Sequence, residues 1–374
     1  MKTKITRSFS ILSIAFFTFV SDNDFTIHLN ILNIERKMQR GNETMKAQVI
    51  ETFGDESVFQ TKEIPVPVCK EHEVLVKVRA SSVNPIELKI RSGFVPHLAP
   101  QKPAILNADV AGVVVKVGEK VTSFSVGDEV YGCAGGIGQT QGALAEYMAC
   151  DAQLIAKKPK RLSFKEAAAL PLVSITAYEG LFDKAHFQKG DSILVYGATG
   201  GVGHVALQMA KRSGLHVVAA VSSKEKEELA TKLGADATFQ YKVESIEDVI
   251  KRETDGEGFD LVFDPVGDDH LQEAFKAAKP NGQIITTSSR STQDLSLMHQ
   301  KALSLHVVFM LLPLLHGKNR KHHSDILTTL TQWVDEQSIT PLLDPQTFLF
   351  EEVGNAHQYV ASRKAIGKVV LLPK

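Results

Sequence analysis

The chain has almost no excess of charge of either sign. It carries 42 lysine and arginine residues against 43 aspartate and glutamate residues, a formal net charge of −1 over 374 residues. Nucleic acids and anionic membrane surfaces select proteins with a pronounced basic patch. The one basic cluster, Lys318–His323 ("KNRKHH"), is best interpreted as the solvated start of a helix, with nucleic-acid contact as the lesser alternative. We therefore expect neither nucleic acid nor a membrane as a partner.

Cysteine is equally scarce. The three cysteines, Cys69, Cys133 and Cys150, include no Cys-x-x-Cys pair, so the sequence predicts no disulfide framework and a reducing compartment, the cytoplasm. Cys133 lies among glycines ("YGCAGGIG"), where a small loop residue is the favoured interpretation and an accessible thiol is the alternative.

Long hydrophobic runs are missing as well. The segment Ile11–Val20 follows Lys2, Lys4 and Arg7 as in a signal peptide, but it is too short to span a bilayer and no small-x-small cleavage site follows. We interpret residues 1–44 as an extension, disordered or signal-like, and expect the working protein to begin near Met45. A true export signal remains the alternative.

Two patterns of secondary structure divide the rest of the chain. Residues 45–147 contain short β-branched runs separated by Gly, Pro and Asp, such as "HEVLVKVRASSV" and "ADVAGVVVKVG", which indicate a curled β-rich lobe. Ser163 and Glu166 then form a Ser-x-x-Glu capping box that predicts a helix start. From there strands and helices alternate, which is typical of a parallel sheet with helices on both faces. The fold class is therefore α/β.

The densest glycine cluster follows the predicted strand "SILVYG" and precedes a helix. Its six residues are Ala198, Thr199, Gly200, Gly201, Val202 and Gly203. Ala198, Gly200 and Gly203 take the three positions of a Gly-x-Gly-x-x-Gly fingerprint, with Ala in the first. Such a loop lets a diphosphate reach the amides at a helix N-terminus, because no side chain blocks the approach. A bare tight turn is the alternative, but the strand–helix context favours dinucleotide binding.

A carboxylate is absent where the next strand ends. An NAD-binding unit would place Asp or Glu there to accept the ribose hydroxyls, whereas this chain has "AAVSSKEK". Ser222, Ser223, Lys224 and Lys226 offer hydroxyl and ammonium groups, which attract a 2′-phosphate. The sequence therefore predicts NADPH as the cofactor. The alternative is that the lysines are surface charges at a helix start.

Several motifs occur in the order found in one known family. They are "VNPIELKIRSG", "NADVAGVVVKVGEKVTSFSVGDEVYG", "GALAEY", "AAALPLVSITAYEGL", "GATGGVG", "FDPVG" and "GKVVLLP". From Met45 to Lys374 the chain resembles the medium-chain dehydrogenase/reductase superfamily, in its zinc-independent quinone oxidoreductase (ζ-crystallin-like) branch. The resemblance implies a GroES-like β-rich catalytic lobe, residues 45–170 and 309–374, and a doubly wound parallel-sheet (Rossmann) nucleotide-binding domain, residues 171–308.

The resemblance also implies roles for single residues. Thr176 would contact the cofactor phosphates or ribose, and Tyr241 with Lys226 would hold the 2′-phosphate. Val266 and Ser288 would line the nicotinamide side, with Lys368 as a weaker cofactor-binding candidate. Each residue taken alone could serve ordinary packing or a turn.

Two departures from relatives set the expected chemistry. The zinc-dependent branch has Cys where this chain has Asn84, and Gly-His-Glu where it has Asn107, Ala108 and Asp109, so we expect no catalytic metal. Phe94 stands where relatives often carry a proton-donating Tyr. We expect hydride transfer from NADPH to a quinone or an α,β-unsaturated carbonyl, with Asn84 contacting the substrate oxygen. An Asn that only caps the turn before Pro85 is an equal alternative.

Other functions remain possible. A short-chain dehydrogenase is disfavoured, since neither Tyr178 nor Tyr359 begins a Tyr-x-x-x-Lys motif. An enoyl thioester reductase and a non-enzymatic ζ-crystallin-like NADPH-binding protein stay open. The apolar segment "LHVVFMLLPLL", Leu305–Leu315, predicts an edge strand that ends the nucleotide sheet, and pairing of two such edges predicts a homodimer.

Overall fold

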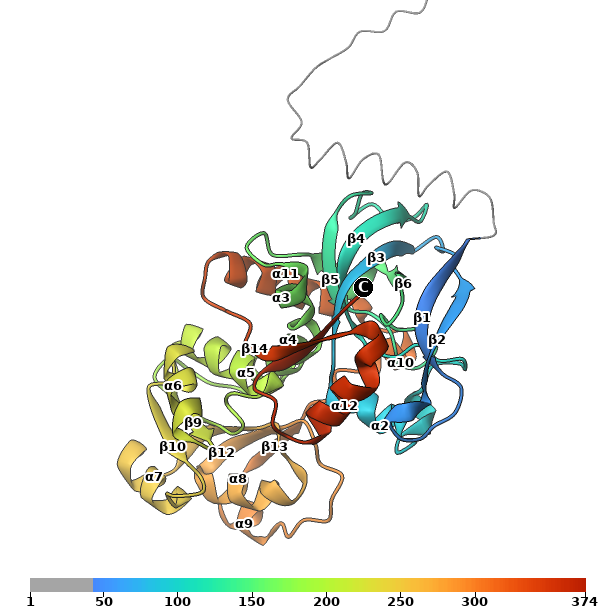
Figure 1. Ribbon diagram of the computed structural model, residues 1–374. Coiled ribbons are helices and arrows are strands. Elements are labelled where there is room, and N and C mark those ends of the chain that lie inside the picture. Colours follow the sequence, from blue (N-terminus) through green and yellow to red (C-terminus); the bar gives the residue numbers. More distant parts are fainter. Residues whose placement is uncertain (1–42) are drawn as a thin grey trace, which may run out of the picture. The chain divides into compact units, whose positions relative to one another are not determined.

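The computed structural model describes residues 43–374 (Figure 1). The predicted extension, residues 1–44, lies outside the described residues except for its last two positions. Thr44 already belongs to a strand, because β1 (Thr44–Ile50) pairs antiparallel with β2 (Phe59–Pro65). In the part of the chain that the structure describes, no helix combines the length and the apolar character needed to cross a bilayer.

Strands from residues 73–157 and from the C-terminal residues 343–372 build one seven-stranded sheet, which is the predicted β-rich lobe. Its order is β14-β15-β3-β4-β5-β7, and β6 also pairs with β3. In Figure 1 the C-terminal strands, in red, accordingly lie beside β3. The strands are β3 (Glu73–Ser82), β4 (Asp109–Val117), β5 (Glu129–Cys133), β6 (Tyr147–Asp151), β7 (Ile155–Lys157), β14 (Leu343–Leu349) and β15 (Lys368–Leu372).

The second sheet has six strands, all parallel, in the order β10-β9-β8-β11-β12-β13. Adjacent residues of β8 belong to two different hydrophobic clusters: Ile193 to the one that includes Val205, and Leu194 to the one that includes Phe275. A parallel sheet covered on both faces needs such continuous apolar strands. The strands are β8 (Ser192–Val195), β9 (His216–Val221), β10 (Ala237–Gln240), β11 (Phe259–Asp264), β12 (Ala278–Thr286) and β13 (Ser304–Val307).

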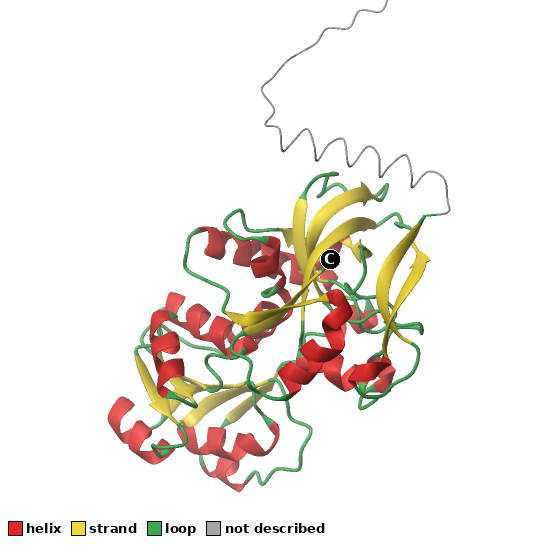
Figure 2. Ribbon diagram, in the orientation of Figure 1, coloured by secondary structure: helices red, strands yellow, loops and turns green. Residues whose placement is uncertain are grey.

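The helices connect these strands and cover both sheets (Figure 2). Those of the first half are α2 (Pro85–Arg91), α3 (Phe164–Ala168), α4 (Pro171–Tyr178), a π-helical segment (Glu179–Lys184), α5 (Gly201–Arg212), α6 (Lys224–Lys232) and α7 (Ile246–Glu253). Those of the second half are α8 (Leu271–Ala277), α9 (Ser296–Gln300), α10 (Leu312–His316), α11 (Arg320–Asp335) and α12 (Val353–Ala361). Short 3₁₀ turns lie at Glu56–Val58, Pro96–Leu98, Ala152–Leu154, Asp268–His270 and Phe350–Glu352.

The predicted α/β fold class is confirmed. The strand order also indicates where the parallel sheet would bind a ligand. The chain leaves β8 toward β9 and β10 on one side, then returns to build β11, β12 and β13 on the other. The switch point therefore lies between β8 and β11, and doubly wound sheets bind ligands outside the carboxyl ends of the strands at this point.

Several local expectations need correction. The helix expected from Ser163 onward has its Ser163–Glu166 capping box but divides at Pro171 into α3 and α4, because proline cannot continue the preceding helix. Both interpretations of Cys133 are wrong: the residue is the end of β5 rather than part of a loop, and it is fully buried, which raises the pKa of its thiol.

The C-terminal third differs from expectation at two further places. The apolar strand expected over Leu305–Leu315 is only partly a strand: β13 stops at Val307, and Leu312–His316 form α10 with Pro313 in its first turn. Its predicted place at the sheet edge is confirmed. The basic cluster begins α11, but His323 in it is buried rather than solvated.

Candidate active site

The glycine cluster lies where β8 passes into α5, at the switch point of the parallel sheet. Gly197 makes the turn with a φ of 56°, a left-handed conformation that glycine adopts without cost. A Cβ on Gly203 would lie 2.2 Å from the Gly197 carbonyl oxygen, so α5 can approach the turn only with glycine there. The first N–H groups of α5 have no partner within the helix, and such groups are the donors that a diphosphate can accept from.

Gly197 is a residue that the sequence interpretation missed. The fingerprint assigned Ala198 to its first position, yet Ala198 is fully buried and the turn itself is made by the residue before it. The signal was present, because a glycine directly after an apolar strand is typical of a position that needs positive φ.

The C-terminal strand reaches this loop from the β-rich lobe. The Gly367 N–H donates to the Thr199 carbonyl at 2.8 Å, and Gly200 and Gly367 form an isolated parallel bridge. The side chain of Lys368 then passes over Gly201, with Cδ 3.3 Å from the place of a Cβ on that glycine. The two sheets are thus joined by backbone bonds at the glycine cluster.

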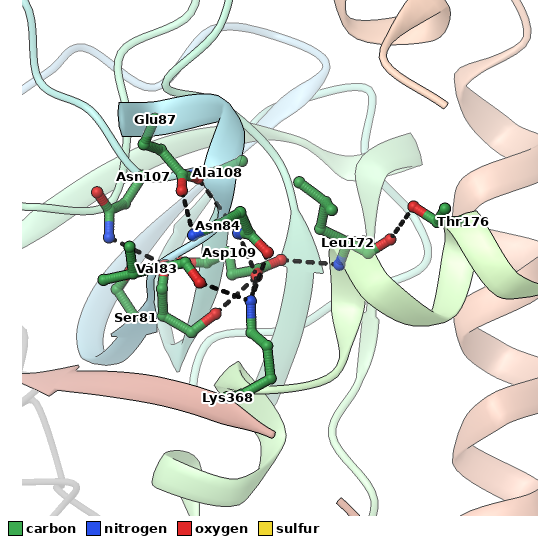
Figure 3. A network of polar contacts seen from close by, with 11 residues as sticks. Ser81, Val83, Asn84, Glu87, Asn107, Ala108, Asp109, Leu172, Thr176 and Lys368 are labelled. Atoms are coloured by element: carbon green, nitrogen blue, oxygen red, sulfur yellow. Dashed lines mark hydrogen bonds and ion pairs between the residues drawn. The ribbon is translucent and has the colours of Figure 1, made fainter. Parts of the chain in front are cut away.

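Lys368 ends in a fully buried polar network (Figure 3). Its ammonium donates to the Val83 carbonyl at 3.0 Å, to Asn84 Oδ1, and to Asp109 Oδ2 at 3.4 Å. The ammonium is therefore committed to the β-rich lobe, while the methylene stem contacts the glycine cluster. The structure places this weaker cofactor-binding candidate beside the loop, with its charge directed away from it.

Asp109 organises the centre of this network. Its Oδ2 accepts from Ser82 Oγ at 2.7 Å and from Asn84 Nδ2 at 2.9 Å. Its Oδ1 accepts from the Leu172 N–H at 2.8 Å, one residue after α4 begins. A carboxylate at the start of β4 therefore fixes the helix that carries Thr176. Thr176 itself is buried, and its hydroxyl donates to the Leu172 carbonyl at 2.7 Å.

Asn84 lies at the N-cap of α2 and is 1 % exposed. Its two amide hydrogens point to Glu87 Oε1 at 3.2 Å and to Asp109 Oδ2, and its oxygen accepts from Lys368. The backbone N–H of Asn84 donates to Glu87 Oε2, which gives the turn one half of a capping box. The capping role is thus present, and contact with a substrate oxygen would require Asn84 to exchange one of these partners.

Glu87 is the second buried carboxyl of the network and was missed in the sequence. Burial raises its pKa from 4.5 to about 7, although the nearby Lys368 ammonium and the N–H groups of Ala108 and Asn84 lower it. The negative charge of Asp109, like burial, raises the pKa of Glu87. The Asn-x-x-Glu spacing after β3 is a capping-box pattern, so this acid was detectable as a turn residue but not as a buried one.

The residues predicted for the 2′-phosphate gather at the ends of β9 and β10. Ser222 and Ser223 follow Val221, and Ser223 caps α6 by accepting from the Lys226 N–H at 3.4 Å. The Tyr241 N–H donates to the Val221 carbonyl at 3.2 Å, which brings this half-exposed side chain beside the same strand end. Val221 ends β9, and the nearest acids, Glu225 and Glu227, follow in the first turn of α6, where Glu227 accepts from Gln240 Nε2 at 3.1 Å.

The residues predicted for the nicotinamide side follow the neighbouring strands β11 and β12. Val266 comes two residues after Asp264 and is 52 % exposed, an unusual position for a branched apolar side chain. Ser288 follows β12 by two residues. Because β11 and β12 pair, with Asp264 opposite Thr286, the two loops lie side by side on the other side of the switch point.

The positions that correspond to the zinc-site Cys and Gly-His-Glu of the zinc-dependent branch are Asn84, Asn107, Ala108 and Asp109. Within residues 43–374, no group of three or more His, Cys, Asp or Glu side chains is arranged to hold a metal ion. Asn84 and Ala108 stand where thiolate and imidazole would be, and Asp109 is already bound to Lys368, Asn84, Ser82 and Leu172. Phe94 lies after α2 and is exposed.

Comparison with known proteins agrees with this arrangement. Residues 70–160 match the family described as alcohol dehydrogenase GroES-like domain, and residues 233–371 match the family described as zinc-binding dehydrogenase. A 2-methylene-furan-3-one reductase of Solanum lycopersicum is 38 % identical over 88 % of this chain and 79 % of its own. An NADPH-dependent alkenal/one oxidoreductase, chloroplastic, of Arabidopsis thaliana is 36 % identical over 88 % and 80 %.

Two further comparisons extend the likeness. A quinone oxidoreductase of Pongo abelii is 29 % identical over 90 % of this chain and all of its own. The crystal structure of an alcohol dehydrogenase superfamily protein from Novosphingobium aromaticivorans superposes with a TM-score of 0.84, at 37 % identity over 88 % of this chain and all of that one. The chain therefore belongs to the medium-chain dehydrogenase/reductase superfamily of oxidoreductases, among its quinone oxidoreductases and enone reductases.

Proposed function

We propose that the protein is an NADPH-dependent reductase that transfers hydride to α,β-unsaturated carbonyls or quinones. The observation that carries the proposal is the pair of features at the switch point: a tight glycine turn before α5, and a β9 end that is followed by two serines and a lysine rather than an acid. The relatives named for alkenal/one, methylene-furanone and quinone reduction support the substrate class.

Preference for NADPH over NADH follows from the β9 end. A 2′-phosphate there meets Ser222, Ser223 and Tyr241, with Lys226 in the first turn of α6. Losing one charge-assisted phosphate contact costs about 1.5 to 3 kcal/mol, or roughly tenfold to a hundredfold in affinity.

This preference is tested by cofactor binding to the wild type, Lys226→Ala and the control Lys232→Ala, whose lysine is exposed in the last turn of the same helix. We expect Lys226→Ala to weaken NADPH while leaving NADH unchanged, and Lys232→Ala to weaken neither. Equal affinity of the wild type for both cofactors would contradict the proposal.

The chemistry of the substrate follows from the donor set. NADPH supplies a hydride, and an isolated ketone accepts hydride poorly unless a Lewis acid polarises its oxygen. The site offers amide, carboxyl and ammonium groups rather than thiolate and imidazole, which supports a zinc-independent reaction. A conjugated carbonyl or quinone delocalises the incoming charge itself, so it needs only hydrogen-bond donors and a proton from water.

Asn84 is the side chain that we propose for the substrate oxygen. Its amide lies between Glu87 and Asp109, so a substrate oxygen would take the place of one of these two acceptors. Asn84→Ala should lower kcat for enones with little change in NADPH affinity. Unchanged kcat would leave Asn84 with its N-cap role alone.

A panel assay separates this proposal from its alternatives. NADPH oxidation is followed with quinones, alkenals, enoyl thioesters and simple ketones. We expect quinones and alkenals above enoyl thioesters, whose less electrophilic carbonyl gains more from the donor that Phe94 cannot supply. Turnover of ketones alone would contradict the mechanism, and tight NADPH binding without turnover would favour the non-enzymatic role. Phe94→Tyr should raise thioester activity alone.

A homodimer is the proposed assembly. β13 ends the parallel sheet, and the apolar side chains of Val307, Phe309 and Leu312 are exposed on and after it. An uncovered edge beside such side chains favours pairing with a second copy, which would satisfy both the backbone and the apolar surface.

We also propose that the protein is located in the cytoplasm. The three cysteines are unpaired, which suits a reducing compartment, and an NADPH-dependent reductase needs a supply of reduced cofactor. Because one relative is named as chloroplastic, fractionation of the full-length protein should distinguish cytosol from organelle.

A further inference from the structure

Asp268 makes four of the hydrogen bonds that join the loops after β11 and β12, and Thr287 Oγ1 adds another by donating to the Pro265 carbonyl at 3.2 Å. All four polar groups of Asp268 are used: the N–H donates to the Ser288 carbonyl at 3.0 Å, and the carbonyl accepts from Gln293 Nε2 at 2.8 Å. Its Oδ2 accepts from Ser288 Oγ at 2.9 Å, and its Oδ1 accepts from the Arg290 N–H at 3.0 Å. Every one of these partners belongs to the loop after β12.

The backbone at this place is built for the cross-link. Gly267 has a φ of 64°, and a Cβ there would lie 2.1 Å from the Ser288 carbonyl oxygen, so the two loops touch through their main chains. Asp268 is itself left-handed, with a φ of 52°, which Asp tolerates better than most residues. Asp264 holds the start of the loop, because its Oδ1 accepts from the N–H groups of Val266 and Gly267.

These loops lie on the side of the switch point opposite the 2′-phosphate residues. A dinucleotide that places its adenosine half over β9 and its diphosphate on the glycine cluster must place its nicotinamide half beyond β8, over β11 and β12. Val266 precedes Asp268 in the first loop with its side chain exposed, and Ser288 is the direct partner of Asp268 in the second.

Asp268 also fixes the polarity of the Ser288 hydroxyl. Because Ser288 Oγ donates its one hydrogen to the Asp268 carboxylate, the oxygen is left as an acceptor. The nicotinamide carboxamide ends in an NH₂ group, which is a donor. The carboxylate of Asp268 therefore leaves Ser288 Oγ ready to accept a hydrogen bond from this NH₂ group.

We propose that Asp268 is a positioning residue for the nicotinamide ring: it holds Val266 and Ser288 at one spacing and presets the Ser288 hydroxyl as an acceptor. This inference rests on the proposed NADPH-dependent function and deepens it. Asp268 touches neither the ring nor the substrate in this proposal, and it acts through the two loops.

Two variants separate the parts of this role. Asp268→Gly keeps the left-handed backbone but removes the carboxylate. Asp268→Asn also tolerates positive φ, and its oxygen can still accept from the Arg290 N–H, but its NH₂ group then faces Ser288 Oγ and reverses that hydrogen bond. The matched control is Asp269→Asn, which removes the same charge from the exposed neighbouring residue.

Binding of two ligands by the purified full chain is the primary measurement. NADPH reports the whole site, whereas adenosine 2′,5′-bisphosphate reports only the adenosine half. We expect both Asp268 variants to weaken NADPH by about tenfold, to leave the bisphosphate within about twofold, and to lower kcat for an enone with a larger isotope effect from 4-deuterated NADPH. Asp269→Asn should behave as the wild type.

The other outcomes overturn the inference. Unchanged NADPH affinity and kcat in both variants would show that the loops need no carboxylate. Parallel loss of NADPH and bisphosphate binding would assign Asp268 a general structural role. Failure of the proposed function is distinguishable, because it would appear in the wild type itself, either as no binding of NADPH or as NADPH binding without turnover of any enone or quinone.

Discussion

The buried carboxyl of Glu87 should make the free energy of unfolding depend on pH. Burial raises the pKa of this carboxyl from 4.5 to about 7. The folded protein therefore holds a proton on Glu87 at pH values where the unfolded chain has released it. The stability that this group contributes is fully present below pH 4.5 and is lost as the pH rises through 7.

The magnitude follows from the size of the shift. One pKa unit corresponds to about 1.4 kcal/mol, so a rise from 4.5 to about 7 corresponds to roughly 3 kcal/mol in the free energy of unfolding. Most of this should be lost between pH 5 and pH 8. Glu87 is fully buried, so solvent screening does not reduce the effect.

Two buried histidines change the free energy of unfolding with pH in the opposite direction, so their contribution has to be removed from the measurement. Burial lowers the pKa of His204 to about 4 and that of His357 to about 3, so each contributes stability that grows as the pH rises toward 6.5. A comparison of the wild type with Glu87→Gln removes both, because the histidines are common to the two proteins.

Urea unfolding of the two proteins between pH 5 and pH 8 is the assay. The difference in free energy of unfolding, wild type minus Glu87→Gln, should fall by roughly 3 kcal/mol or somewhat less across this range, whatever its absolute value. Infrared difference spectra should show a protonated carboxyl band that disappears through pH 7 in the wild type alone. Curves that stay parallel, with no such band, would refute the buried neutral acid.

Three further predictions concern the cofactor loop, the metal and the assembly. Gly203→Ala should cost at least tenfold in NADPH affinity, because its Cβ would lie 2.2 Å from the Gly197 oxygen; unchanged affinity in a fluorescence titration would contradict the close approach of α5. Metal analysis should find no stoichiometric zinc, and chelators should leave activity intact; activity restored only by zinc would overturn the proposal. Val307→Lys should shift sedimentation from dimer to monomer, and a wild type that is monomeric at micromolar concentration would exclude the dimer.

The sequence was most informative where one local rule decides the structure. Continuous β-branched runs alternating with helices identified the parallel sheet, because strands covered on both faces need apolar side chains in succession. The missing acid after β9 and the glycine cluster were visible for the same reason, since each depends on residues adjacent in the chain. Pairing of β9 with β10 then brings Tyr241 to the same place.

The sequence was least informative where residues far apart in the chain form one buried network of charged groups. Glu87 and Asp109 are 22 positions apart and Lys368 belongs to the last strand, so no spacing indicates that they form one network. Taken singly, an acid after a turn or at a strand start is usually solvated. Only the antiparallel pairing of β15 with β3 and β3 with β4 brings the lysine within reach of both carboxyls.

This network gives a physical reason for the polar residues that stand where other family members hold zinc. A site that simply lost its thiolate and imidazole would leave the Asp109 carboxylate buried and uncompensated, which is costly. Here the Lys368 ammonium and the Asn84 amide bind that carboxylate, and a Glu87 carboxyl that is largely neutral below pH 7 adds little further negative charge. The same lysine stem lies over Gly201, so the groups that balance the buried charge also connect the β-rich lobe to the cofactor loop.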